Sequence, residues 1–183
     1  MSNFIVGTNG RPVPTSDDGQ LLVDTTPAPV YATQRGDSYV AAGAADTSAA
    51  DADFFYLKNN DARDLVIFQI RGYIAGGADC GVSIKIGVTG TPGTPTAITP
   101  ANMRSNGPVA NVTCSQRDGD LALTGGTTVD FLFMDKDVVG EQVWDFESGI
   151  VLPHNTALVY NTDADPTGND IATQTFFYFV EPD

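Results

Sequence analysis

The chain of 183 residues has few of the side chains from which most catalytic and metal sites are built. It contains a single histidine, His154, together with two cysteines and one tryptophan. Histidine is the usual base in nucleophilic catalysis, and structural zinc requires clustered cysteine and histidine. No G-x-S-x-G motif supplies a nucleophile elbow. We therefore expect a protein that is not an enzyme and that holds no cofactor.

Lysine and glutamate are also scarce, with three residues of each type in the whole chain. An ordinary helical surface is built largely from these two types, so their shortage argues against a helical fold. No run of 18 apolar residues is present, which predicts that no segment spans a membrane. The first ten residues have neither the basic nor the apolar part of a secretory signal. Cys80 and Cys114 do not make a disulfide framework, and the sequence leaves open whether they pair.

Acidic residues outnumber basic ones by 23 to 9, which gives a net charge of -14 and an isoelectric point near 4.1. Such a chain repels phosphate backbones, so we expect no nucleic-acid partner. The charge is concentrated in residues 111–183, where 13 acidic residues face two basic ones. This acidic third either keeps the protein in solution, faces a basic partner or binds divalent cations, and the sequence leaves these alternatives open.

Residues 1–37 differ from the rest because prolines and glycines interrupt them repeatedly. Proline at this density predicts neither continuous sheet nor helix. We interpret residues 1–37 as an extended N-terminal arm that lies on a surface of its own chain or of a neighbour. Its apolar residues are the candidate capsid or intersubunit contacts: Phe4, Ile5, Val6, Leu21, Leu22 and Val23. Residues 43–52 are small and polar, and we expect a loop there.

Residues 38–183 are predicted to form one β-sandwich domain. From Phe54 onward, short apolar runs alternate with turn residues, and residues 82–88 alternate cleanly between apolar and polar side chains. In residues 65–75 we expect Val66, Phe68 and Ile70 on one face, with Leu65 on the other. The predicted fold is all-β, an antiparallel two-sheet sandwich of jelly-roll type.

The last predicted strand, Ile171 to Glu181, carries aromatic side chains on both faces. A strand in a sheet with one face buried and one face in water should carry them on one face only. Left exposed, these side chains would form an apolar patch that soluble monomers seldom carry, so we expect an oligomer. The candidate trimer or core contacts, which plain core packing would equally explain, are Phe131, Phe133, Phe176, Phe177, Tyr178 and Phe179.

Two groups of acidic residues invite a chemical interpretation. Asp163, Asp165 and Asp170 are a weak calcium candidate, because calcium prefers hard oxygen ligands, although aspartates also simply form turns. Asp145 and Glu147 lie just after Trp144 and are the nearest approach in this sequence to a pair of glycosidase carboxylates. Their i, i+2 spacing on a strand favours a wet acidic face behind a core Trp144, so we expect no metal site and no catalysis.

The order of these segments resembles the small jelly-roll head decoration, or cement, proteins of tailed bacteriophages. The resemblance rests on the proline-rich arm, the strand 64–73, the linker Thr89-Gly90-Thr91-Pro92 and the later 98–102 stretch ITPAN, and it covers most of residues 30–183. It implies a non-enzymatic virion protein that binds the outside of an assembled capsid as a homotrimer at threefold positions. The implied partners are other copies of the chain and the major capsid protein, with assembly in the host cytoplasm. The alternatives are another virion component, such as a tail, neck or receptor-binding sandwich, and a carbohydrate-binding module.

Overall fold

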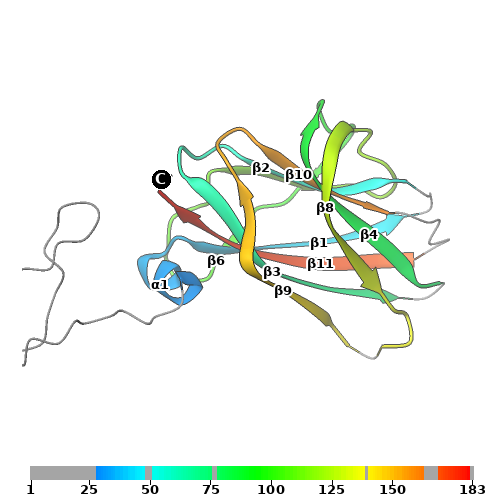
Figure 1. Ribbon diagram of the computed structural model, residues 1–183, viewed down its shortest axis with the longest axis horizontal. Helices are drawn as coiled ribbons and strands as arrows, with labels where there is room; N and C mark the ends of the chain where they lie inside the picture. Colours follow the sequence, from blue (N-terminus) through cyan, green and yellow to red (C-terminus); the bar gives the residue numbers. More distant parts are fainter. Residues whose placement is uncertain (1–27, 48–50, 76–77, 139, 163–168, 182–183) are drawn as a thin grey trace, which may run out of the picture.

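The computed structural model describes residues 28–47, 51–75, 78–138, 140–162 and 169–181. Within these residues the backbone is almost entirely β-strand, with one short helix (Figure 1). The elements in chain order are α1 (Ala28–Arg35), β1 (Ser38–Thr47), β2 (Asp53–Asn59), β3 (Asp64–Ala75), β4 (Cys80–Thr89), β5 (Thr96–Ala97), β6 (Ala101–Asn102), β7 (Val112–Gln116), β8 (Thr124–Met134), β9 (Gln142–Leu152), β10 (Ala157–Thr162) and β11 (Asn169–Val180).

Two antiparallel sheets pack face to face. The β1 sheet has the strand order β6-β1-β11-β3-β9, and the β2 sheet has the order β5-β7-β2-β10-β4-β8. Four strand pairs are nested along the chain: β1 with β11, β2 with β10, β3 with β9, and β4 with β8. The chain is therefore one long hairpin whose successive pairs alternate between the sheets, which is the topology of a jelly roll. The prediction of an antiparallel two-sheet sandwich is confirmed.

The main core lies between the sheets and is rich in aromatic side chains. Phe55 stacks on Tyr160 with ring centroids 4.6 Å apart, and Tyr39 stacks on Phe177 at 5.5 Å. The Tyr160 hydroxyl and Thr175 Oγ1 lie 2.7 Å apart, and both residues are fully buried. This hydrogen bond joins β10 of one sheet to β11 of the other, so it satisfies two polar groups that would otherwise be buried without a partner.

A second, smaller apolar cluster covers part of the outer face of the β2 sheet. Tyr56, Val88 and Val159 are buried there beneath Leu121, which is itself fully buried. Leu121 lies in the connection between β7 and β8, where its amide donates to the carbonyl of Asp53 at 2.7 Å. A loop thus shields a sheet face that a single-layer sheet would leave wet.

The prediction of extended backbone throughout residues 1–37 is wrong for residues 28–35, because these form the helix α1. Pro29 stands in the first turn, where its missing amide costs nothing. The helix ends in a Schellman motif: the amides of Gly36 and Asp37 donate to the carbonyls of Thr33 and Ala32, and Gly36 has φ of 81°. The expected loop at residues 43–52 is likewise wrong for residues 43–47, which complete β1 and pair with β11.

The expected faces of β3 hold for Leu65 and Phe68 but are wrong for Ile70, because the strand contains a bulge. Its register with β9 shifts between Ile67 and Gln69. Leu65, Ile67 and Ile70 therefore all point into the core and are fully buried, whereas Phe68 lies on the outer face. An extra residue in one strand inverts the alternation beyond it, and period-2 reasoning has no means of locating such a residue.

Candidate interaction surface

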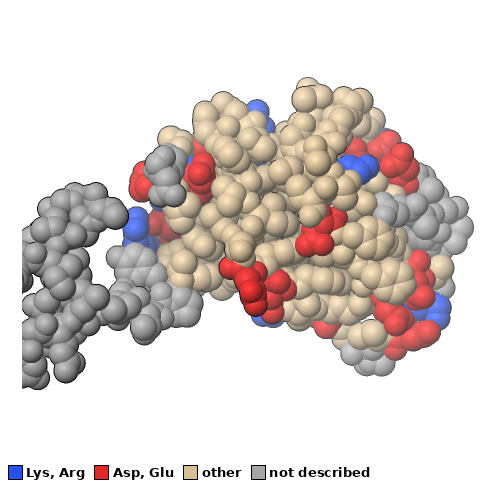
Figure 2. Space-filling view, viewed as in Figure 1, with Lys and Arg blue, Asp and Glu red and all other residues tan. Residues whose placement is uncertain are grey.

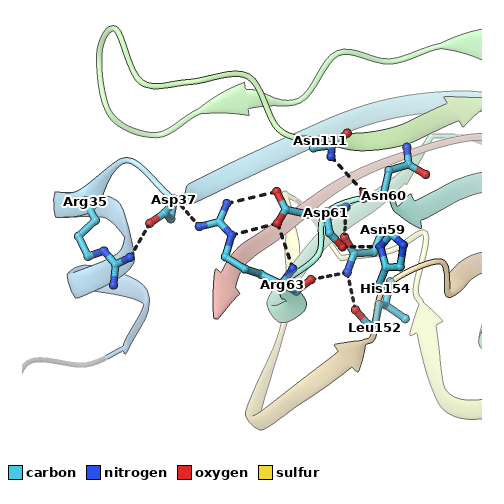
Figure 3. A network of polar contacts seen from close by, with 9 residues as sticks. All are labelled: Arg35, Asp37, Asn59, Asn60, Asp61, Arg63, Asn111, Leu152 and His154. Carbon is cyan, nitrogen blue, oxygen red and sulfur yellow. Dashed lines mark hydrogen bonds and ion pairs between the residues drawn. The ribbon is translucent and has the colours of Figure 1, made fainter. Parts of the chain in front are cut away.

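A network of charged and amide side chains fixes one end of the sandwich, where α1 meets β1 and β11 (Figure 3). Arg63, just before β3, donates to Asp37 at 2.9 Å and to Asp61 at 3.0 Å. Its guanidinium also lies 4.9 Å from the ring centroid of Phe179. The hydrogen bond from Arg63 holds the pKa of the Asp61 carboxyl below its usual range. Because Arg35 also pairs with Asp37 at 3.4 Å, the network ties α1 to the sandwich.

The same network organises the two turns beside it. The Asn59 side-chain amide donates to the carbonyls of Arg63 and Leu152, at 2.8 and 2.9 Å. His154, the histidine noted in the sequence, is exposed, and its Nδ1 donates to the carbonyl of Asp61 at 2.7 Å. This arrangement holds the β2–β3 turn against the β9–β10 turn. The histidine is held by a backbone carbonyl, which fits a role in stability.

Strand β8 presents an exposed apolar strip on the outer face of the β2 sheet. Phe131 is 48% exposed and Phe133 is 53% exposed, while their neighbours Leu132 and Met134 fill the core. Of the two alternatives predicted for Phe131 and Phe133, core packing is excluded within the described chain, and trimer contact stays a prediction. Phe131 lies over Gly81 of β4, where a methyl group would collide with its ring. The pattern follows from alternation along a strand at the edge of its sheet.

The outer face of the β1 sheet carries a second aromatic group. Phe177 and Phe179 of β11 are buried in the core, whereas Phe176 and Tyr178 lie half-buried on the outer face beside Phe68. The guanidinium of Arg71 lies 4.9 Å from the ring centroid of Phe176, in cation–π geometry. The rings of Phe176 and Tyr178 stay partly exposed among the described residues. Together with the strip on β8, they give each sheet an apolar outer surface that a partner could cover.

Both sheets end on the same side of the molecule, at β8 and β9. Each strand is bonded to only one neighbour among the described strands. Between them a slot of about 470 Å³ opens toward the core, lined by Ile86, Val129, Phe146 and Ile150 among others. In Figure 2 the acidic side chains lie in separate groups around a broad uncharged area. Sequence reasoning did not identify Val129 or this slot. Whether a strand lies at the edge of a sheet depends on the topology of the whole fold and not on the local residue pattern.

The acidic candidates do not form a metal centre in the described part of the chain. No group of three or more His, Cys, Asp or Glu residues there is placed to hold a metal ion. Of the calcium candidates, Asp163 and Asp165 lie outside the described residues, and Asp170 begins the pairing of β11 with β3. The predicted arm contacts also lie outside the described residues: Phe4, Ile5, Val6, Leu21, Leu22 and Val23. Trp144 packs against the core while Asp145 and Glu147 are exposed, as the spacing predicted.

One carboxylate, that of Asp53, is buried beside the β7–β8 connection. It accepts a hydrogen bond from Asn161 at 2.8 Å and another from the Leu123 amide at 3.3 Å, and Asp120 accepts from the Asp53 amide at 3.1 Å. Burial raises the pKa of the Asp53 carboxyl, and the hydrogen bond from Asn161 opposes this shift. Because the oxygens of Asp53 have partners inside the protein, this group holds a loop in place.

Cys80 and Cys114 are both buried free thiols, and burial raises the pKa of Cys114 to about 12. No helix among the described residues is long and apolar enough to cross a membrane. Comparison with protein-family models, with curated proteins and with solved structures found no match.

Proposed function

We propose that this chain is a non-enzymatic structural subunit that binds the outside of an assembled bacteriophage capsid as a homotrimer at threefold positions. The observation that carries the proposal is the exposed apolar strip on β8, where Phe131 and Phe133 are about half exposed. A soluble monomer rarely leaves such aromatic surface open, because burying it in a partner is favourable. The half-buried rings of Phe176 and Tyr178 on the opposite sheet add a second apolar face.

The mechanism is thermodynamic. A subunit that binds the assembled shell, and not its separated parts, stabilises the shell by mass action. Three copies joined in one trimer would bind three neighbouring shell positions at once, which raises the effective affinity without requiring new contacts. The rigid two-sheet domain, clamped at its α1 end by Arg63, suits a part that holds its shape rather than one that turns over a substrate.

Two measurements test the proposal. Light scattering after gel filtration should give three times the 19.3 kDa of one chain. Purified protein should also cosediment with isolated heads of the phage that encodes it, and it should not sediment with tails. A variant lacking residues 1–27 keeps α1 and is expected to remain folded but to lose head binding. A monomer that ignores heads would overturn the proposal, and cosedimentation with tails alone would favour another virion position.

A further inference from the structure

The four sheet edges of this sandwich are finished in two different ways. On one side, the outermost strands β5 and β6 are only two residues long. Beside them, the Ala44 and Asp46 amides of β1 donate to the side chains of Gln116 and Asp118, at 2.7 and 3.0 Å. Short edge strands and side-chain caps are the usual means of preventing strand pairing with another chain. This side is closed.

The opposite side, formed by β8 and β9, has long edge strands whose main protection is a bulge in each: β8 shifts register against β4 at Val129, and β9 shifts register against β3 at residues 146–149. Each strand is eleven residues long and, among the described strands, is paired on one side only. Neither contains proline, lysine or arginine, the residues that commonly block an edge. One local cap is present, where the Phe131 amide donates to the side chain of Asp130 at 2.7 Å. The contrast within one molecule indicates that this edge is kept available.

The chemistry of the open edge specifies what it can accept. The slot between the strands is walled by Ile86, Val129 and Phe146, and its volume of about 470 Å³ has room for apolar side chains. The charged residues that line it are Asp130 and Glu147, both exposed acids, and no lysine or arginine lines it. An occupant must therefore bring apolar groups and positive charge together.

This charge pattern disfavours the two occupants that the chain itself could provide. A second copy presenting the same edge would bring a second Asp130 and Glu147, and no lining lysine or arginine, to the interface. The residues 1–27 carry one arginine and three aspartates, so they are acidic as well. Like charges across an interface are unfavourable, which leaves a basic partner.

We propose that the β8–β9 edge binds an extended segment of a different protein by strand addition, and that this segment alternates apolar residues with lysine or arginine. Its backbone would continue one of the sheets, as edge-binding peptides do. Alternate side chains of an extended chain point to opposite faces, so apolar groups would enter the slot while basic groups reach Asp130 and Glu147. The inference does not depend on the partner being a shell protein.

The test uses fluorescein-labelled ten-residue peptides and fluorescence anisotropy on the full-length protein. A peptide of alternating isoleucine and lysine should bind, and the affinity should fall as salt is added. A peptide of alternating isoleucine and glutamate should not bind, nor should the lysine peptide with every second backbone amide methylated. Glu147→Lys should weaken binding about tenfold, the effect of losing one charge-assisted contact. Asp46→Lys, the same change at an exposed acid of the closed edge, should leave binding intact.

Several results would overturn the inference. Equal binding of the acidic and basic peptides, or no loss with Glu147→Lys, would remove the charge argument, and unchanged binding of the methylated peptide would remove strand addition. Tighter binding of a synthetic peptide of residues 1–27 would assign the edge to the arm. Self-association abolished by Val129→Glu, but not by the matched Val109→Glu, would assign it to a second copy. If the Glu147→Lys variant binds no peptide yet still decorates heads, the edge inference and the proposed function are shown to be separate.

Discussion

The hydrogen bond between Tyr160 and Thr175 allows a quantitative test of how the two sheets are held together. The hydroxyls are 2.7 Å apart, and both residues are fully buried. Tyr160→Phe removes one hydroxyl and leaves the other buried without a partner, which costs about 1–3 kcal/mol of unfolding free energy. Thr175→Val leaves the phenol unpaired at a similar cost of about 1–3 kcal/mol.

The double variant removes both polar groups together, so no buried hydroxyl is left unsatisfied. We expect its loss of stability to fall short of the sum of the single losses by about 1–2 kcal/mol. Urea unfolding followed by the fluorescence of Trp144 measures these differences. In a chain of this size, 1 kcal/mol also corresponds to a shift in melting temperature of about 2–4 °C.

Tyr73→Phe is the matched control, because Tyr73 is 45% exposed on the outer face of β3. Its removal of a hydroxyl should change stability by less than about 0.5 kcal/mol. If the two core substitutions are as mild as this control, or if their effects simply add, the hydroxyls do not pair across the sheets and the described packing is incorrect.

Three further predictions concern the network, the aromatic residues and the thiols. Arg63→Ala should cost about 2 kcal/mol, because it leaves Asp37 and Asp61 partly buried without their cation. Since the folded pKa of Asp61 is lowered, the stabilisation by Arg63 is full at neutral pH and is lost as the pH falls below about 4, so thermal melts of Arg63→Ala and wild type should converge in acid. Phe177→Ala should lower the free energy of unfolding by about 3–5 kcal/mol, because Phe177 is fully buried. Phe131→Ala should barely change the free energy of unfolding measured in urea, because Phe131 is half exposed. Equal losses for the two phenylalanines would contradict their assigned burial. Cys80 and Cys114 should resist a thiol reagent at pH 8 until the protein unfolds, because burial disfavours the Cys114 thiolate. Rapid modification of the native protein would show that the thiols are accessible.

Much of the sheet architecture was predictable because it depends on local alternation. Residues 82–88 alternate apolar and polar side chains, and β4 places Val82 and Ile84 in the core accordingly. The same reasoning placed Ile70 on the wrong face of β3, because the bulge near Phe68 leaves no mark in composition. It also missed α1, whose eight residues are fixed by a Schellman motif and by contacts with β1 and β11 rather than by an apolar stripe.

The interaction surface was predictable only in part. Residue type alone identified Phe131 and Phe133 as interaction candidates, but it did not decide between core and surface. That choice depends on β8 being the last strand of its sheet, which is a property of the whole topology. The slot beside Val129 was likewise invisible, since its walls come from three strands separated along the chain.

The position of β11 has a consequence for how the protein is made. This strand is the last of the described strands, yet it lies between β1 and β3 in the interior of its sheet (Figure 1). Before β11 has been synthesised, β1 and β3 have no strand to join them, and the aromatic core lacks Phe177 and Phe179. Folding must then wait until β11 has been synthesised, when long-range pairing closes the sandwich in a late step. A chain that lacks β11 would accordingly have an unfilled sheet and exposed apolar strands, which chaperones and proteases recognise.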